Sequence, residues 1–495
     1  MMMRHILWAA VAATALTACG GDSSDSPAPS PTPTPTPSPS PLPVSGDRIE
    51  PLDTALSPSS AQAKSAQAAT RHIPAGAPVG RVQLGPLAVV KSAVAPEAKG
   101  VAYRIGEGRD VLATAEADGL AALLSWSPTA DGGLVAGISF VADGAQAVRL
   151  GVLADSIPAG TVLRFYGAET DEVVEMSAAQ LAALRLGNEQ GGVTGDAARM
   201  VWGPDTTGDV STLEVQLAPG VDPAVLRLAV PRLSHLGATA EQTLTSKTVE
   251  SIGSSASCHQ DVMCRPDLET ESRSVAKMLY TSSADGRSYM CTGTLLNDAK
   301  GSRTPNFVTA THCVPDQATA SSLITYWFFR AAACNSTPQY DQSMTRVTGG
   351  SQLLFANASI DTTLLRLYSS PPARVVYAGS YFGAGVQSGL DVVGIHDPMG
   401  DLQKYSLGEV TGYALCTSDS CNAADANTGL RYQVTWQLGS TQQGSSGSAI
   451  FAQSGNSRYV IGTLWGGNAS CSGGGADYYG RFNKAYDAGV KNWIQ

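Results

Sequence analysis

The chain of 495 residues is poor in charge and in aromatic side chains. Only 15% of its residues are charged and 6% are aromatic, and its formal net charge is −10. A deficit of basic charge argues against nucleic acid as a partner. The 52 glycines and the scarcity of charged residues are untypical of helical proteins. The composition therefore indicates a globular protein with little helix, long enough for more than one domain.

The apolar run at the N-terminus is too short to cross a bilayer. It covers residues 6–16, follows the basic Arg4 and precedes small residues and Cys19. A run of this length is typical of a secretory signal that is removed. The sequence LTAC followed by two glycines resembles a bacterial lipobox, which implies lipidation of Cys19 and a membrane anchor. Ordinary cleavage after residues 13–15 would instead leave a soluble secreted protein.

Residues 20–47 are rich in proline, serine and threonine and are expected to be a linker. Within them, residues 27–43 alternate proline with serine or threonine. Such a segment favours polyproline II and cannot form a core. At about 3.1 Å per residue it spans roughly 50 Å. The linker would hold the following domains away from a membrane.

Cysteine is absent from residues 20–257, and no C-x2-C pair occurs anywhere. Lipidation of Cys19 leaves eight of the nine cysteines, an even number that predicts up to four disulfides in an exported chain. The sequence alone allows 105 pairings of eight cysteines. Cys416 and Cys421 have no histidine nearby, so they are expected to close a small loop. We predict neither a metal site nor a cofactor.

Residues 48–247 are expected to form a β-rich, sandwich-like domain without a catalytic group. Six short apolar alternations punctuated by turn residues predict strands at 81–90, 134–142, 147–154, 161–167, 211–218 and 224–230. One helix is predicted from the N-cap Ser177 to Gly187. The Ala/Ser-rich residues 48–75 are interpreted as a tether or a marginal helix. Residues 243–257 are interpreted as a linker, and strands resume after them.

Histidine is absent after residue 396, and this limits the chemistry of the segment QQGSSGSAIF at 442–451. A serine nucleophile needs a histidine base, which in turn needs an orienting carboxylate. The Ser…Asp…His order of α/β-hydrolases is excluded because every histidine precedes Ser446. Their G-x-S-x-G motif is also broken, because residue 448 is serine. The orders His…Asp…Ser and Asp…His…Ser remain open.

His312 and Asp361 are the candidate partners of Ser446. His312 follows an apolar strand and a small-residue turn in NFVTATHCVPD, and Asp361 stands just before an apolar strand in NASIDTTLLRL. A carboxylate at the start of a buried strand can accept the histidine Nδ1–H. Gly444 and Gly447 allow a tight turn, so the N–H groups of Gly444 and Ser446 could form an oxyanion hole. The competing carboxylates are Asp341, Asp391, Asp397 and Glu409. His396 is interpreted as a loop residue.

Residues 253–495 resemble bacterial lysyl endopeptidases, which have the chymotrypsin fold. The matching pieces occur in order: SCHQDVMC, CTGTLLN, TATHCV, DTTLLRL, QQGSSGSAIF and LWGGNASC followed by DYYGRF. The resemblance implies a two-barrel, trypsin-like protease domain at 248–495 in an all-β protein, acting on polypeptide substrates. It also implies the disulfides Cys258–Cys471, Cys264–Cys334 and Cys291–Cys313, with Cys416–Cys421 as an addition. No comparable family pattern is evident before residue 248.

The resemblance also implies a specificity site. Asp477 matches the family's acid at the base of the S1 pocket, where a carboxylate selects a cationic side chain. The strand at 463–467 is expected to pair with the substrate, with Gly466 and Gly467 leaving room for its side chain. The family has histidine where this chain has Trp465, and a tryptophan that segment 412–419 lacks. These departures favour Arg as well as Lys, because a guanidinium can stack on the Trp465 indole.

Two serines mark differences from trypsin. Ser440 stands where trypsin has its pocket acid, and Ser445 excludes the ion pair that activates trypsin-like zymogens. Residues 48–247 are therefore interpreted as a pro-region, removed by autocleavage after Lys247, with release of the protease from the anchored part. Two alternatives stay open: a serine protease of other specificity, and a protease-like surface protein that binds a ligand.

Overall fold

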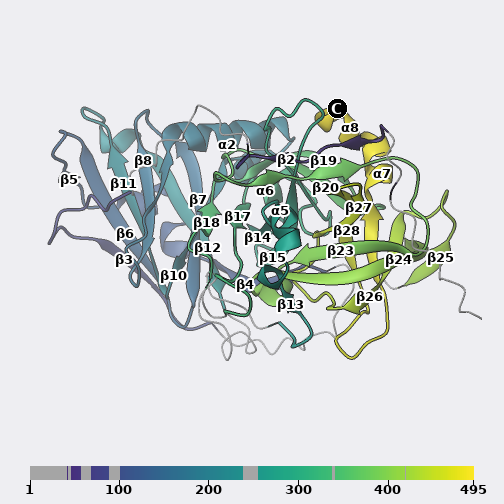
Figure 1. Cartoon of the computed structure of the whole chain (residues 1–495). Helices are drawn as coiled ribbons and strands as arrows, with labels where there is room; N and C mark the ends of the chain where they lie inside the picture. The colour runs from purple at the N-terminus through teal and green to yellow at the C-terminus, as the bar shows by residue number, and fades with distance from the viewer. Residues whose placement is uncertain are drawn as a thin grey trace, which may run out of the picture. The chain divides into compact units, whose positions relative to one another are not determined.

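The computed structural model describes residues 42, 46–56, 69–87, 101–237, 255–336, 340–417 and 420–495. Cys19, Lys247 and most of the Pro/Ser/Thr-rich linker lie outside the described residues. Strands dominate and helices are short, so the predicted all-β class is confirmed (Figure 1). In the part of the chain that the structure describes, no helix is long and apolar enough to cross a membrane.

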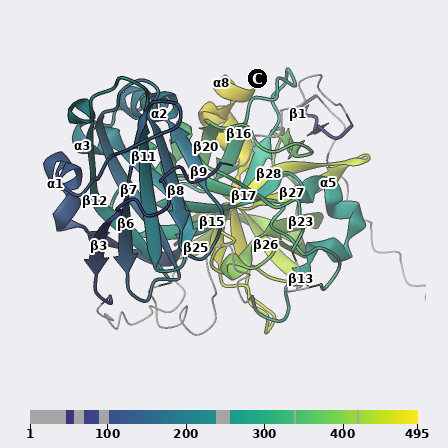
Figure 2. The same ribbon diagram turned by 90° about the vertical axis from the view of Figure 1, so that its left-hand side faces the viewer.

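The N-terminal domain consists of two β-sheets packed face to face (Figure 2). The first has the order β3 (Gly80–Leu84), β6 (Leu134–Ala142), β11 (Val210–Leu217), β8 (Val162–Gly167) and β9 (Val174–Ser177), with β5 (Ser127–Pro128) beside β6. The second contains β10 (Met200–Thr207), β7 (Ala147–Ser156), β12 (Arg227–Leu236) and β4 (Tyr103–Asp110). Ile138 and Phe165 of the first sheet share one buried core with Leu150 and Leu233 of the second. Each of the six strands expected in this region has a counterpart. The first ends at Leu84, with residues 88–90 outside the described residues, and the last begins at Arg227, after a 3-10 helix at Pro223–Val225.

The predicted helix begins as expected but ends later. In α2 (Ala178–Gln190) Ser177 is the N-cap and forms a reciprocal capping box with Gln180. The predicted end at Gly187 is wrong, because the helix continues to residue 190. A Cβ at Gly187 would lie 1.7 Å from the Tyr368 hydroxyl oxygen. The glycine therefore makes room for the Tyr368 side chain within the helix and does not end it.

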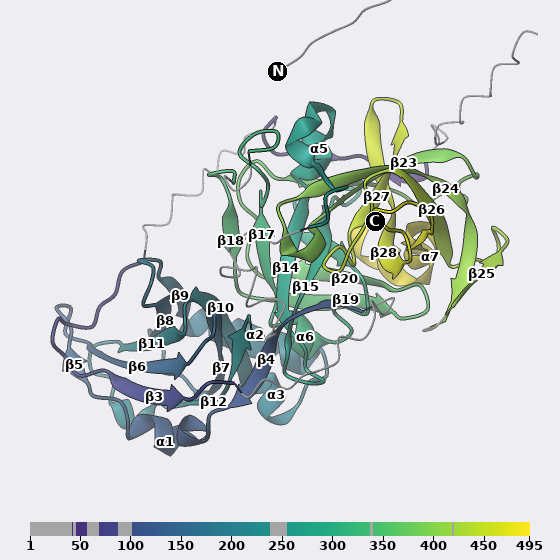
Figure 3. The ribbon, with the colours of Figure 1, turned by 90° about the horizontal axis from the view of Figure 1, so that it is seen from below.

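The C-terminal domain contains two β-barrels, as predicted. The first is open and has the order β18 (Thr345–Val347), β17 (Ile324–Trp327), β14 (Val275–Thr281), β15 (Ser288–Leu296), β16 (Asn306–Thr309), β20 (Thr362–Leu367) and β19 (Ser351–Asn357). The second has the order β27 (Ala449–Ser454), β23 (Leu390–His396), β24 (Lys404–Cys416), β26 (Arg431–Leu438), β29 (Asp477–Arg481) and β28 (Ser457–Gly467). It closes because β28 pairs with both β29 and β27, and Figure 3 shows these strands curving around a common interior.

The remaining helices and strands are short, and some of the strands connect the N-terminal residues with the C-terminal domain. The helices are α1 (Ala117–Ala121), α3 (Gly195–Arg199), α5 (Glu269–Ser272), α6 (Gln317–Ala320), α7 (Phe482–Ala485) and α8 (Lys491–Ile494), and the additional strands are β13 (Gln260–Asp261) and β25 (Cys421–Ala424). The start of the expected tether forms strands instead. β1 (Arg48–Ile49) pairs with β22 (Gly379–Tyr381), and β2 (Leu52–Asp53) pairs with β21 (Val376–Tyr377). β4 of the N-terminal domain pairs with β15 of the C-terminal domain.

Candidate active site

The segment around Ser446 forms a tight turn between β26 and β27. The backbone φ angles of Gly444 and Gly447 are +90° and +80°, a region that favours glycine. A Cβ at Gly447 would lie 2.1 Å from the Thr309 Oγ1, and one at Gly444 would lie 2.9 Å from the Asp397 carbonyl oxygen. Larger residues would therefore displace the turn from the strands that support it. This turn is called the nucleophile turn below.

Thr292 on β15 holds the nucleophile turn from one side. Its backbone N–H donates to the Ser446 carbonyl oxygen at 2.8 Å, and its Oγ1–H donates to the Gly444 carbonyl oxygen at 2.9 Å. These bonds occupy the carbonyl groups of the turn. Within the described residues, the N–H groups of Gly444 and Ser446 donate no hydrogen bond to the chain. The two groups proposed as an oxyanion hole are thus available for a ligand.

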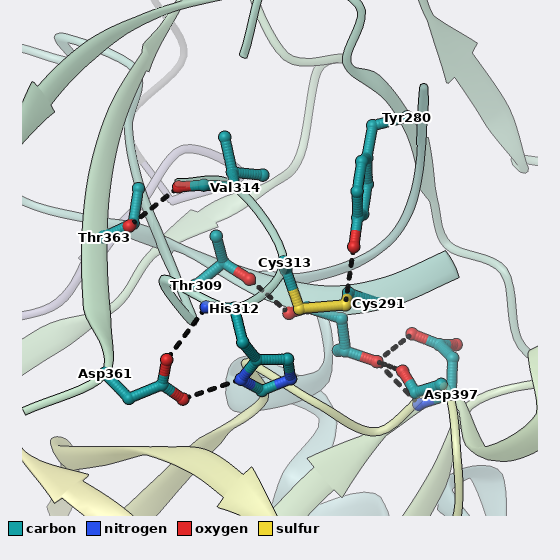
Figure 4. The surroundings of a disulfide bond; sticks show 11 residues. Tyr280, Cys291, Thr309, His312, Cys313, Val314, Asp361, Thr363 and Asp397 are labelled. Carbon is teal, nitrogen blue, oxygen red and sulfur yellow. Dashed lines mark hydrogen bonds and ion pairs between the residues drawn. A yellow bond between two sulfur atoms is a disulfide. The ribbon is translucent and has the colours of Figure 1, made fainter. Parts of the chain in front are cut away.

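Asp361 orients His312 through two hydrogen bonds (Figure 4). Its Oδ1 accepts the His312 backbone N–H at 2.9 Å, and its Oδ2 lies 2.8 Å from His312 Nδ1. A carboxylate accepts hydrogen bonds, so Nδ1 carries the ring proton and Nε2 keeps a lone pair. Nε2 is buried and has no hydrogen-bond partner among the described residues. The ring is therefore in the tautomer that a general base requires.

The loop that carries His312 is fixed on both sides. The disulfide Cys291–Cys313 ties it to β15, and the Tyr280 hydroxyl lies 3.5 Å from the Cys291 sulfur (Figure 4). The Thr363 Oγ1–H donates to the Val314 carbonyl oxygen at 3.0 Å. The competing carboxylates make no such contact, since in the described part of the chain only Asp361 is hydrogen-bonded to His312.

The four expected disulfides are all present. They join Cys258 to Cys471, Cys264 to Cys334, Cys291 to Cys313 and Cys416 to Cys421. Two groups of possible metal ligands, around His259 and His312, consist otherwise of disulfide-bonded cysteines. A disulfide sulfur is not the thiolate that binds zinc, so these groups do not make metal sites.

Asp477 is buried at the start of β29 and is held by two side-chain donors. Its Oδ2 accepts hydrogen bonds of 2.7 Å from Trp436 Nε1–H and from Thr441 Oγ1–H. Burial raises the pKa of Asp477, an effect that these two hydrogen bonds oppose. A Cβ at Gly467 would lie 2.3 Å from Asp477 Oδ1, so the glycine is required for the carboxylate to occupy this place. A cation brought to this carboxylate would offset the cost of its burial.

Trp465 is buried and packs against side chains of the chain itself. Only 7% of Trp465 is exposed, and the Arg431 guanidinium carbon lies 5.0 Å from the centre of its ring. The Tyr478 ring packs edge-on against it at a centroid distance of 6.4 Å. The Arg431 guanidinium therefore lies over one face of the indole. Stacking of a substrate guanidinium on this ring stays a prediction.

His396 is not a loop residue. It is the last residue of β23 and is fully buried, and its ring lies between Ser445 and Ser406. The sequence analysis also missed Thr292, Trp436 and Thr441. Thr292 could have been found because it follows Cys291 directly. Nothing in the local sequence connects Trp436 or Thr441 with Asp477, which lies 36 or more residues further on.

Three features together define the trypsin-like serine endopeptidases. They are a closed barrel, an open barrel, and a His–Asp pair beside a serine turn that is flanked by glycines. Comparisons with known proteins give the family. The model of the "Lysyl endopeptidase, C-terminal domain" matches residues 252–480, and that of the "Lysyl endopeptidase N-terminal domain" matches residues 78–237. The chain belongs to the lysyl endopeptidase family, so the predicted resemblance is confirmed and extends to the N-terminal domain.

The chain is also similar to individual known proteins. Over 412 residues the chain is 34% identical to lysyl endopeptidase of Pseudomonas aeruginosa, covering 80% of this chain and 83% of that protein. Among solved structures, the active form of the Rv3671c protease from M. tuberculosis is 15% identical, with 49% of this chain and 89% of that chain covered and a TM-score of 0.31. The HtrA-type protease AlgW with a tripeptide is 16% identical, with 46% and 62% covered and a TM-score of 0.32.

The protein is thus a serine endopeptidase, and its substrates are polypeptides. Its four disulfides and its family indicate an exported protein.

Proposed function

We propose that this endopeptidase hydrolyses peptide bonds through an acyl-enzyme formed on Ser446. The Ser446 hydroxyl attacks the substrate carbonyl carbon, and His312 Nε2 takes the hydroxyl proton. The resulting oxyanion accepts hydrogen bonds from the Gly444 and Ser446 N–H groups. His312 then gives its proton to the leaving amine, and water hydrolyses the acyl-enzyme by the same steps. Asp361 keeps the imidazole oriented and stabilises its charged form.

The observation that carries this proposal is the hydrogen bonding of the two ring nitrogens of His312. Its Nδ1–H is bound to Asp361, while the buried Nε2 lacks a partner among the described residues. An unpaired buried ring nitrogen costs free energy, and its retention is explained if it accepts a proton during catalysis. The unoccupied N–H groups of the nucleophile turn support the same mechanism.

We propose that cleavage follows a basic residue, Lys or Arg, which Asp477 recognises. Both side-chain donors to Asp477 bind Oδ2, and the Ala469 backbone N–H is a further donor to the carboxylate. A charged substrate would pair with the Asp477 carboxylate. The alternative is a serine endopeptidase of different specificity.

Two experiments test these proposals. A fluorophosphonate should label the full chain and fail to label Ser446→Ala; labelling that persists in the variant would refute Ser446 as the nucleophile. Cleavage-site profiling should show Lys or Arg before the cut for the wild type. That preference should disappear in Asp477→Asn, whose melting temperature should rise because a buried charge is removed. A preference for Lys or Arg that is unchanged in Asp477→Asn would refute the role of Asp477. A wild type without this preference would favour the alternative specificity.

We further propose lipidation at Cys19 and cleavage after Lys247, with residues 48–247 acting as a pro-region. The pairings of β1, β2 and β4 with protease strands do not depend on the peptide bond after Lys247. The buried Arg149 side chain adds hydrogen bonds to the Ser322 carbonyl and to Thr281. The two pieces of a cut chain should therefore stay together after cleavage, contrary to the release of the protease that the sequence analysis expects. Gel filtration of the cleaved protein without denaturant tests this, and separate elution of the pieces would contradict it.

A further inference from the structure

His396 joins the nucleophile turn to the hairpin formed by β23 and β24. The ring is fully buried, with Nδ1 2.8 Å from the Ser445 Oγ and Nε2 3.1 Å from the Ser406 Oγ. Ser445 directly precedes Ser446, and Ser406 lies on β24. Because both ring nitrogens are engaged inside the protein, the ring cannot reach a substrate.

The direction of every hydrogen bond in this group follows from counting protons. The Ser406 hydroxyl donates its one proton to the Ser440 carbonyl oxygen at 2.7 Å, so it must accept from the ring Nε2–H. A neutral ring then has a lone pair on Nδ1, which accepts the Ser445 hydroxyl proton. The Ser445 Oγ in turn accepts the Gln442 backbone N–H at 3.3 Å.

The neutral form is the one that the surroundings favour. Burial lowers the pKa of His396 well below its usual value of 6.5, and the nearby His259 and Lys404 act in the same direction. Every group in the chain of hydrogen bonds, from the Ser440 carbonyl to the Gln442 N–H, therefore has a partner.

We propose that His396 is a positioning residue that fixes the nucleophile turn through Ser445 and Ser440. A serine at residue 445 cannot form the ion pair that activates trypsin-like zymogens. The hydrogen bonds of the neutral His396 ring to Ser445 and Ser406 take the place of that ion pair. The turn is braced at its entry, Ser440, and at the residue before the nucleophile. This inference rests on the proposed role of Ser446.

The consequence for catalysis concerns kcat more than KM. Releasing Ser445 lets the Ser446 Oγ and the Gly444 N–H move, whereas the Asp477 carboxylate keeps its own donors. Displacing a reacting group by about 1 Å costs on the order of 10²-fold in rate. Loss of the bracing should therefore lower kcat by roughly 10-fold to 100-fold and leave KM within a few-fold.

The test uses the full chain and a peptide lysine p-nitroanilide. His396→Leu and Ser445→Ala should each lower kcat, and the double variant should lose no more than one of them, because both break the same connection. His396→Asn should retain more activity than His396→Gln, since the shorter amide can place an acceptor near Ser445. Additive losses, or full kcat in both single variants, would overturn the proposal.

Two further measurements separate positioning from folding and from the mechanism itself. Ile395→Ala removes buried volume from the adjacent position and should lower the melting temperature while kcat is kept; an equal loss of kcat would indicate a merely structural role. Nitrogen chemical shifts of His396 should show a proton on Nε2 and none on Nδ1, and a proton on Nδ1 would refute the inference whatever the activity. Wild-type protein that a fluorophosphonate does not label would instead refute the proposed function.

Discussion

Thr292 donates its hydroxyl proton to the carbonyl oxygen of Gly444 across a distance of 2.9 Å. The same residue also accepts the Asp397 backbone N–H at 3.1 Å. Thr292 follows Cys291, whose disulfide partner Cys313 stands beside His312. One strand, β15, therefore supports both the nucleophile turn and the loop of the general base.

Replacement of Thr292 by valine should lower kcat by about 10-fold or more, because the nucleophile turn loses a side-chain support. It leaves the Gly444 carbonyl and the Asp397 N–H without this partner, which should cost about 1–3 kcal/mol of stability. Steady-state kinetics and thermal unfolding measure both effects. Thr294→Val is the matched control, because the buried Thr294 hydroxyl oxygen has no partner among the described residues. Equal losses in both variants would contradict the assigned role.

Replacement of Gly467 by alanine should abolish the preference for basic residues. The added Cβ would lie 2.2 Å from the Ala476 carbonyl oxygen and 2.3 Å from Asp477 Oδ1, so the carboxylate must move. We expect kcat/KM on a lysine substrate to fall on the order of 100-fold, while fluorophosphonate labelling of Ser446 persists. Gly412→Ala is the control, since a Cβ there would meet nothing within 4 Å. Unchanged kcat/KM in Gly467→Ala would show that Asp477 does not contact the substrate.

Replacement of Asp397 by asparagine should change how stability depends on pH. Burial raises the pKa of Asp397 from 3.8 to about 7, with Lys277 opposing the shift. Between these values the folded chain binds a proton that the unfolded chain has lost, so the contribution of Asp397 to stability falls as pH rises through this window. The melting temperature of the variant relative to the wild type should rise from pH 5 to pH 8. The exposed Asp391→Asn provides the control, and a constant difference would contradict the assignment.

The disulfides should differ in their contribution to stability. Cys258 and Cys471 are separated by 213 residues, and Cys416 and Cys421 by 5. The entropy of loop closure predicts a loss of roughly 5 kcal/mol for the first pair and about 2 kcal/mol for the second when both cysteines become serine. Urea unfolding of the two double variants measures the difference. A larger loss for the Cys416–Cys421 variant would contradict the chain-entropy argument.

Much of the fold was predictable because its signals are local. The alternation at 134–142 became β6 and that at 147–154 began β7, since a period of two residues selects a strand. The end of α2 was not predictable, because Gly187 accommodates Tyr368, a residue far away in the chain. The pairing of residues 48–53 with protease strands had no local signal either, since strands of two residues carry no periodicity.

The sequence by itself determined the order of His312, Asp361 and Ser446, the even number of cysteines beyond Cys19, and the absence of an acid at residue 445. These follow from residue identity and spacing. Only the tertiary structure decided what surrounds them. It brought Thr292 to the nucleophile turn, Trp436 to Asp477, Arg431 to Trp465 and His396 to Ser445. Such contacts join segments that are separated along the chain, and they are set by the curvature and register of the barrels, which no local pattern records.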